Sequence, residues 1–440
     1  MRKEYNGDYV NRQYYANGNY PYVTGYEVDL RLEYDNYFYI QRYPESVTYV
    51  ELYLHDSGGN GTCDLWYATS DENDVCLENW RNVLELASNG RLSTNRNTCV
   101  IDFNKEQFGN RIYFKTETDR NLCNKVKIDC DGPFDVGGNI ASMYSSDMFI
   151  EELKGNFSYM FYQNKNIRHA ERLILGTTLY LDCETSSNVD VFGPSHIGAS
   201  CYYYMFYNSS LLSTPRGIGG IQFNGASSHE FMFASCYNMY HGPLIFSGFR
   251  SRGFGARAFA YCFSSCQNMK LLPFNYSTYG TTSLGAADFG IPNVSYVGKI
   301  FEGCFRNCHR MEYLLYDTGL PRVIWVCGDD CTNNKVPAQM FYTMFSECHS
   351  LETAPELWIG VKSGGTWNTV TIESQVFSEM FQNSKNLKNI TYLCRTAPNT
   401  STHVNWVAGV SPTGTFTKSG SGWSNSFSVS AIPSGWTVIG

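Results

Sequence analysis

The feature that most constrains this chain is a short pattern that recurs seven times between residues 148 and 395. In each copy a Met or Cys precedes a Phe, a Cys or small polar residue stands three positions after the Phe, and Leu, Met or Ile follows three positions later. The central residues are Phe161, Phe206, Phe233, Phe263, Phe305, Phe345 and Phe381. Self-similarity of this kind is typical of repeat proteins, in which each copy is one structural unit.

The residues around each central Phe have a helical spacing. With that Phe as position 0, another aromatic residue usually stands at position −4, and His229 is the exception. Positions −4, −1, 0 and +3 lie on one face of an α-helix. Asn residues just beyond this stripe, and Pro ten residues after several of the Phe residues, predict a turn. A brief apolar run between them, such as 269–272, predicts a strand, so each unit is predicted to be helix, turn and strand.

A unit with one apolar stripe and one short strand cannot bury its hydrophobic face alone, so neighbouring units must stack. We therefore predict a solenoid of about seven helix-turn-strand units over residues 140–395, resembling leucine-rich repeats. Its core should hold the seven Phe residues, each worth about 1.5–3 kcal/mol by burial, and the position +3 cysteines. These are Cys236, Cys266, Cys308 and Cys348. The insertions 276–295 and 317–337 are expected on one face as contact surfaces.

The regions on either side of the repeats have a different pattern of residue types. Residues 1–25 are rich in Tyr and poor in aliphatic residues, which predicts an extended arm. Residues 26–135 alternate apolar and polar residues between Gly, Asn and Asp clusters, which predicts an antiparallel β-sandwich that serves as a docking domain, with one possible helix within 78–88. Residues 396–440 should form a β-rich C-terminal cap, because the last repeat would otherwise expose its stacking face. The predicted fold class is α+β.

The copy that follows the repeat pattern most fully is Met344-Phe345-Ser346-Glu347-Cys348-His349-Ser350-Leu351, and Thr353-Ala354-Pro355-Glu356-Leu357 comes after it. This motif resembles the BspA-like leucine-rich repeats, and the resemblance covers about residues 148–440. Members of that family act as adhesins on bacterial surfaces and occur in virion proteins of tailed phages that infect gut bacteria. The resemblance implies binding or assembly rather than catalysis. Asn164, Ser209 and Ser384 depart from it by replacing the Cys.

Composition excludes several classes of protein. The net charge is −8 and the Lys and Arg residues are scattered, so we expect no nucleic-acid partner. No run of about 18 apolar residues and no export signal is visible, so we expect a soluble chain without a membrane span. The 16 Cys residues are diluted over 440 residues, so we expect free thiols. The 33 Tyr and 28 Phe residues suit either contact surfaces or β-strands.

Few residue groups suggest chemistry. Two Cys-x-x-x-Cys pairs, at 262–266 and 304–308, have a spacing that can bind zinc, but they occupy repeat positions where other units carry Met or Ser, which indicates packing. For Cys327 and Cys331 a metal and a disulfide both stay open. In Ser228-His229-Glu230 adjacent side chains should point apart, unlike a catalytic triad. Paired carboxylates cannot be judged without their spatial separation. We expect no enzyme activity, no cofactor and no metal site.

These observations predict a phage virion structural protein, such as a fibre, tail or head-attached component. Its expected partners are other virion proteins or a protein or glycan on the host surface, and we expect a homo-oligomer. The alternative is a secreted bacterial adhesin on the cell surface. A glycan-binding module that uses exposed residues such as Trp358 and Trp367 is a further alternative.

Overall fold

A computed structural model describes residues 37–440, apart from gaps, and the predicted arm 1–25 lies outside the described residues. The gaps are 44–45, 56–62, 88–96, 104–108, 119–124, 146–151, 154–156, 176–177, 182–188, 193–195, 216, 219–222, 241, 246–252, 271–288, 292–297, 313–322, 327–334, 361, 364–365, 368–369 and 420–422. Much of both predicted insertions therefore falls outside the described residues.

The N-terminal region forms two sheets. One has the order β10-β8-β1-β6-β3-β4 and comprises β1 (Phe38–Arg42), β3 (Trp66–Thr69), β4 (Arg81–Asn82), β6 (Arg111–Lys115), β8 (Phe134–Asn139) and β10 (Arg172–Ile174). The other comprises β5 (Asn97–Asp102), β2 (Tyr49–His55) and β7 (Lys125–Cys130), in that order. Every strand pair here is antiparallel except β8–β10. Alternate residues of β2, namely Val50, Leu52 and Leu54, are buried, as the sequence alternation requires.

The predicted helix-turn-strand unit is wrong, and the α+β fold class is wrong with it. The described residues contain no α-helix; their helical segments are two short 3-10 helices, η1 (Val83–Leu86) and η2 (Ile140–Met143). The first of these takes the place of the helix considered within 78–88. Around each central Phe the chain forms instead a run of overlapping β-turns, which we call the turn ribbon. It comprises residues −4 to +3 of each repeat.

The first repeat shows how the turn ribbon is bonded. The N–H groups of Phe157, Tyr159, Phe161 and Gln163 donate across to carbonyls of the next repeat at 2.7–3.0 Å. The N–H groups of the residues that follow Tyr159, Phe161 and Gln163, at 160, 162 and 164, donate to the carbonyls three residues earlier in the same repeat. Tyr159 and Gln163 have positive φ, as the third residue of a type II turn requires. Alternate residues thus bond within the repeat and to its neighbour.

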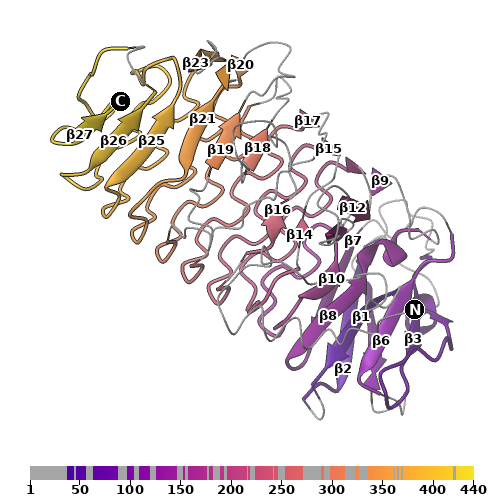
Figure 1. Cartoon of the computed structure of the whole chain (residues 1–440). Coiled ribbons are helices and arrows are strands. Elements are labelled where there is room, and N and C mark those ends of the chain that lie inside the picture. Colours follow the sequence, from indigo (N-terminus) through magenta and orange to yellow (C-terminus); the bar gives the residue numbers. More distant parts are fainter. Residues whose placement is uncertain are drawn as a thin grey trace.

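Short strands flank the turn ribbon, so each repeat is one coil of a solenoid (Figure 1). Before the ribbon run the leading strands, which are β9 (Glu152–Leu153), β13 (His196–Ile197), β15 (Phe223–Asn224), β17 (Gly253–Phe254), β20 (Lys335–Val336) and β24 (Thr371–Ile372). After it run the trailing strands, which besides β10 are β14 (Gly217–Ile218), β16 (Leu244–Ile245), β18 (Phe289–Ile291), β19 (Val323–Val326), β21 (Glu356–Ile359), β25 (Asn389–Leu393), β26 (Thr415–Lys418) and β27 (Thr437–Ile439). Pairs within each set are parallel.

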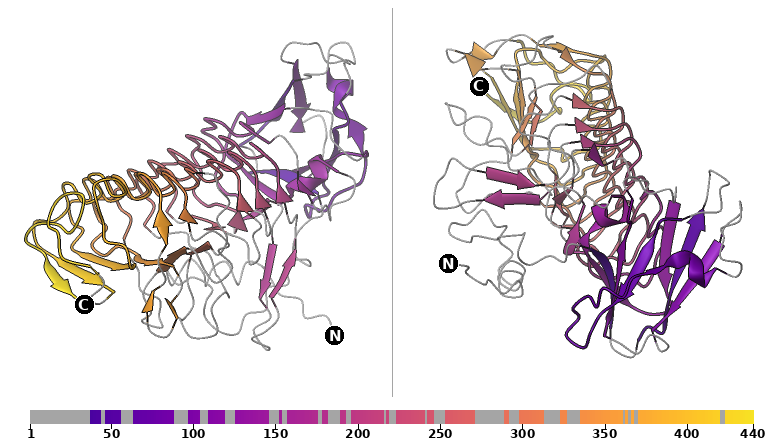
Figure 2. Two further views of the ribbon diagram at one scale, coloured as in Figure 1. Left: turned by 90° about the horizontal axis from the view of Figure 1, so that it is seen from above. Right: turned by 90° about the vertical axis from the view of Figure 1, so that its right-hand side faces the viewer.

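Two antiparallel hairpins leave the coils. The first is β11 (Thr178–Leu181) with β12 (Val189–Phe192), and the second is β22 (Lys362–Ser363) with β23 (Thr366–Trp367). Figure 2 shows the β11–β12 hairpin projecting from the stack of coils. Each hairpin follows a trailing strand along the chain, β11 after β10 and β22 after β21.

The N-terminal sheets continue directly into the first coil. Strand β10 of that coil adds in parallel to β8. The Ile128 N–H of β7 donates to the Met160 carbonyl at 2.9 Å, as one coil does to the next. The Phe38 ring lies 6.5 Å from the Phe161 ring. A single apolar cluster therefore extends from Phe38 to Trp436, across the predicted boundary near residue 135.

An eighth coil lies within the region predicted as a cap. Phe381 N–H donates to the Trp406 carbonyl at 2.8 Å, which places Trp406 at position −1 and Val407 at position 0. Asn405 and Gly409 have the positive φ found at −2 and +2 in the other coils. The final layer is formed by residues 427–432 and β27, and it lies at the far end of the stack (Figure 1).

Candidate functional site

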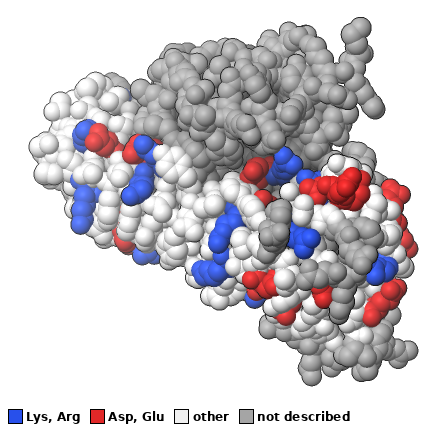
Figure 3. All heavy atoms as spheres, turned by 90° about the horizontal axis from the view of Figure 1, so that it is seen from below, with Lys and Arg blue, Asp and Glu red and all other residues white. Residues whose placement is uncertain are grey.

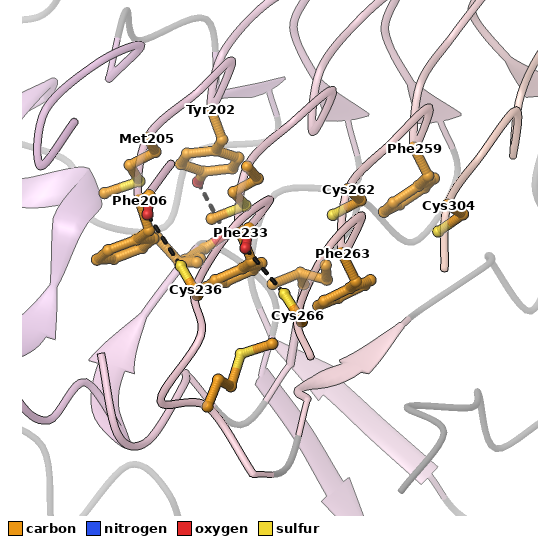
Figure 4. Packing of buried hydrophobic residues seen from close by; sticks show 14 of the residues in the cluster. Tyr202, Met205, Phe206, Phe233, Cys236, Phe259, Cys262, Phe263, Cys266 and Cys304 are labelled. Carbon is orange, nitrogen blue, oxygen red and sulfur yellow. Dashed lines mark hydrogen bonds between the residues drawn. The ribbon is translucent and has the colours of Figure 1, made fainter. Parts of the chain in front are cut away.

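The seven predicted core phenylalanines form one ladder along the solenoid. Phe161, Phe206, Phe233, Phe263, Phe305, Phe345 and Phe381 are all fully buried. Neighbouring ring centroids are 5.2–5.8 Å apart, with interplanar angles of 4–15°. Figure 4 shows three of these rings side by side, each from a different coil. Stacking places one ring in every coil, so each coil completes the apolar surface of its neighbour.

The +3 residues form a second ladder, which is made of hydrogen bonds. The thiol of Cys266 donates to the Phe233 carbonyl of the preceding coil at 3.0 Å, and Cys236 bonds Phe206 in the same way (Figure 4). Cys308 and Cys348 repeat the contact at 3.1 and 3.2 Å. Where Ser replaces Cys, the hydroxyl makes the same bond: Ser209 to Phe161 and Ser384 to Phe345. Asn164 donates instead to Ile128 of β7 at 3.2 Å.

The buried thiols are poorly suited to chemistry. Burial raises the pKa of the Cys236 and Cys348 thiols to about 12, so neither forms the reactive thiolate near neutral pH. Eleven described cysteines are free, as expected from the sequence, but Cys63 is disulfide-bonded, so that expectation is wrong there. Cys327 and Cys331 lie outside the described residues. No group of three or more His, Cys, Asp or Glu in the described part of the chain could hold a metal ion.

Position −4 forms a third ladder, and two of its members are histidines. His229 stacks on Phe259 with centroids 4.6 Å apart, and His403 of the eighth coil stacks on Phe377 at 4.8 Å. Both imidazoles are fully buried, and burial lowers the pKa of each to about 3. In each, Nδ1 meets the hydroxyl of the preceding residue, while Nε2 has no hydrogen-bond partner. Both histidines are therefore neutral members of the core.

The Ser228-His229-Glu230 sequence does not form a catalytic site. Ser228 Oγ meets His229 Nδ1 at 2.9 Å, so these two neighbours contact each other. Glu230, in contrast, accepts from the Arg257 guanidinium at 2.5 Å. The same guanidinium lies 3.4 Å from Glu302, which also accepts from the Tyr261 hydroxyl. Glu230 thus belongs to an ion-pair cluster that joins three coils and is separate from His229.

A polar cluster that sequence reasoning missed lies at the junction of the N-terminal sheets and the solenoid. His169 Nδ1 is 3.0 Å from Ser213 Oγ and 3.6 Å from Glu171 Oε2, and Ser213 donates to Glu171. The hydrogen bond with Glu171 raises the pKa of His169. Burial opposes ionisation of Glu171, but the hydrogen bonds from His169 and Ser213 outweigh it and lower the pKa of Glu171 to about 2. A triad needs serine and acid on different imidazole nitrogens, whereas here both meet Nδ1. Their separation of up to 44 residues left no sequence signal.

Aromatic side chains also follow the outer side of the turn ribbon. At position −2 the half-buried rings of Tyr159, Tyr204, Phe231 and Tyr261 stack in series at 4.7–5.4 Å. We call these four residues the outer aromatic row. The row ends at Gly303, where a Cβ atom would lie 2.3 Å from the Tyr261 ring. Because the rings stack along the solenoid, their edges face outward.

The other residues singled out in the sequence do not gather at one site. Trp358 is half-buried and its indole donates to Glu356 at 2.8 Å, while the Trp367 side chain lies outside the described residues. His309 and His349, which each follow the +3 Cys of their repeat, are half-buried and stack on each other at 4.6 Å. Figure 3 shows charged side chains in small separate groups on the face drawn there. No described helix is long and apolar enough to cross a membrane.

Comparisons with protein-family models, with curated proteins and with solved structures find no match to this chain.

Proposed function

We propose that this chain is a non-enzymatic structural or adhesion protein that presents the outer surface of a stacked solenoid to other molecules. One observation carries the proposal: the residue types that could perform chemistry are used for stacking inside the coils. The Cys and Ser residues at +3 bond the preceding coil, and His229 and His403 fill aromatic positions. Outside the core, the described coils carry the half-buried outer aromatic row, a composition that suits contact surfaces.

The partners that we propose are other proteins of a phage virion, or a protein or glycan on the host surface. The resemblance of the repeat to BspA-like repeats supports a virion component such as a fibre, tail or head-attached protein. The N-terminal sheets would dock on the particle, because exposed apolar side chains, Val75 and Leu77, occur there together. In this proposal the protein is located in the virion.

Mass spectrometry of density-purified particles tests this location. We expect peptides of this chain to copurify with capsid and tail proteins. Replacing Val75 and Leu77 by Lys should reduce incorporation, because a buried lysine pair opposes docking. Leu212→Lys, at an exposed apolar residue of the second coil, is the matched control and should incorporate normally. Absence of the chain from all particles would refute the virion location.

The alternative is a bacterial surface adhesin or a glycan-binding module. The disulfide at Cys63 favours it, because disulfides persist in oxidising environments outside the cytoplasm. Cell fractionation with protease treatment of intact cells distinguishes the two locations. Digestion of the chain on intact cells, together with binding on a glycan array, would support the alternative. A chain that is protected from protease and binds no glycan would contradict it.

A further inference from the structure

The final layer of the solenoid does not resemble a closed end. Terminal repeats normally carry a polar outer face that keeps the last apolar surface from water. Here Phe427, Val429 and Ile439 are 51%, 49% and 53% exposed, and all three lie in the last layer. This layer is itself ordered against the eighth coil, because Val407 N–H donates to the Val429 carbonyl at 3.2 Å and the Trp406 indole donates to Ala431 at 2.7 Å.

The same layer ends in a strand with an open edge. Within the described part of the chain, β27 pairs with β26 and is the last strand of its sheet. Thr437 N–H donates to Gly414 at 2.9 Å, so residues 437 and 439 direct their backbone groups toward β26. Because these directions alternate along a strand, the Val438 N–H and C=O point away from the sheet. Figure 1 shows β27 at the outer end of the stack.

Charge, which commonly protects such edges, is missing here. Natural edge strands are often blunted by Lys or other charged side chains. Residues 419–440 contain no Asp, Glu, Lys, Arg or His, although 17% of the whole chain is charged. Within the described residues 427–440, which form the last layer, a highly charged partner would find no complementary side chain. Two copies of the surface, in contrast, would not repel each other.

We propose that a second copy of this chain docks on this end layer, with the two β27 strands paired antiparallel about a two-fold axis. Centring the axis at Val438 places each Val438 opposite the other, so that both exchange N–H···O=C bonds. Thr437 then lies opposite Ile439 of the other copy on the same outer face. The exposed Val429 and Phe427 would supply apolar area beside the strands. The result is two solenoids joined end to end.

Sedimentation of the full chain tests the proposal across about 1–200 µM, the range in which a small interface of this kind dissociates. We expect twice the mass of one chain at the upper concentrations. Because no ion pair forms across the interface, the dissociation constant should change less than about twofold between low and high salt. A single-chain mass at every concentration would overturn the proposal, and the open edge would then be left to a strand from a different protein.

Two variants locate the contact. Val429→Lys with Ile439→Lys should weaken association at least about tenfold, because each lysine would lose solvent in the interface. Val438→Pro removes the outward N–H without touching the bonds to β26, so it should weaken association while the thermal transition stays unchanged. Val100→Lys, at a 42% exposed residue of β5, is the matched control and should associate normally. Unaltered association of the first two variants would refute this interface. The outcome is independent of whether the chain belongs to a virion.

Discussion

The +3 side chain of each coil is a hydrogen-bond donor in a buried position. Five central Phe carbonyls, those of Phe161, Phe206, Phe233, Phe263 and Phe305, accept both the N–H three residues later and the thiol or hydroxyl of the next coil. Phe233 O, for example, accepts from Cys236 N and from Cys266 Sγ. This explains why Cys and Ser can replace each other at +3. Sequence analysis treated the position as a packing slot, because the size of Cys is visible in a sequence and the carbonyl opposite it is not.

Removing that donor should therefore cost stability even when volume is kept. Cys266→Val leaves one acceptor of the Phe233 carbonyl without its partner, and we expect the free energy of unfolding to fall by about 1–2 kcal/mol. Cys266→Ser keeps the donor and should lose less than half of that. Urea unfolding of the three proteins provides the comparison. Equal stability of the Val and Ser variants would show that the thiol contact contributes nothing.

The Phe ladder should be the most sensitive part of the core. Phe233→Ala removes a fully buried ring that stacks on Phe206 and Phe263, so we expect a loss of about 3–5 kcal/mol in the free energy of unfolding. Tyr237→Ala is the control, since that ring is 44% exposed and its loss should change stability by less than about 0.5 kcal/mol. If both substitutions cost the same in urea unfolding, Phe233 is not in the core.

The two ladder histidines should make the protein sensitive to acid. Their pKa in the folded state is about 3, whereas the ordinary value is 6.5, so the unfolded chain binds protons first as the pH falls. Their contribution is thus fully present above pH 6.5 and is lost between pH 6.5 and pH 3. From pH 7.5 to pH 5 we expect a loss of about 2 kcal/mol per histidine.

Replacing both by Phe, the residue that other coils carry at −4, tests that pH dependence. The His229→Phe and His403→Phe double variant should lose about 4 kcal/mol less than the natural chain between the same two pH values, as measured by urea unfolding. Parallel pH profiles for the two proteins would mean that the histidines are protonated in the folded state or reach water.

The turn ribbon explains why a helix was predicted. Its inward residues are −4, −1, 0 and +3, which is also the spacing of one helical face, so burial alone cannot separate the two backbones. The difference lies in the bonds, which run to the adjacent coil at alternate residues. A usable signal was present at +2, where Gln163, Asn208, Ser235, Ser265, Asn307, Glu347 and Asn383 are all polar and all have positive φ. Asn is enriched in that conformation.

Backbone conformation at +2 gives a test of this element. Ser235 has φ 61°, which a β-branched residue adopts only with strain. Ser235→Val should lower the free energy of unfolding by about 1–2 kcal/mol, whereas Ser235→Gly should change it by less than about 1 kcal/mol. In a helix the order would be reversed, because Val is the better helix former of the two. Thermal or urea unfolding of both variants decides between the two backbones.

Across the whole molecule, the stacking of repeats could be predicted because each unit is visibly incomplete by itself. The N-terminal sheets and the coils share one core, with Phe38 beside Phe161, and such contacts between distant residues leave no trace in a single sequence. The eighth coil was missed because Trp406 and Val407 replace the Met-Phe pair. The Ser213, His169 and Glu171 cluster was missed because its members come from two different coils.

A crystal structure of the solenoid would test the central claim most directly. We expect the seven Phe rings in one near-parallel stack with neighbours 5.2–5.8 Å apart, and N–H groups at alternate residues donating to the next coil. Continuous hydrogen bonds from each residue to the carbonyl four positions earlier, in the segments around the central Phe residues, would contradict the turn ribbon and restore the helix.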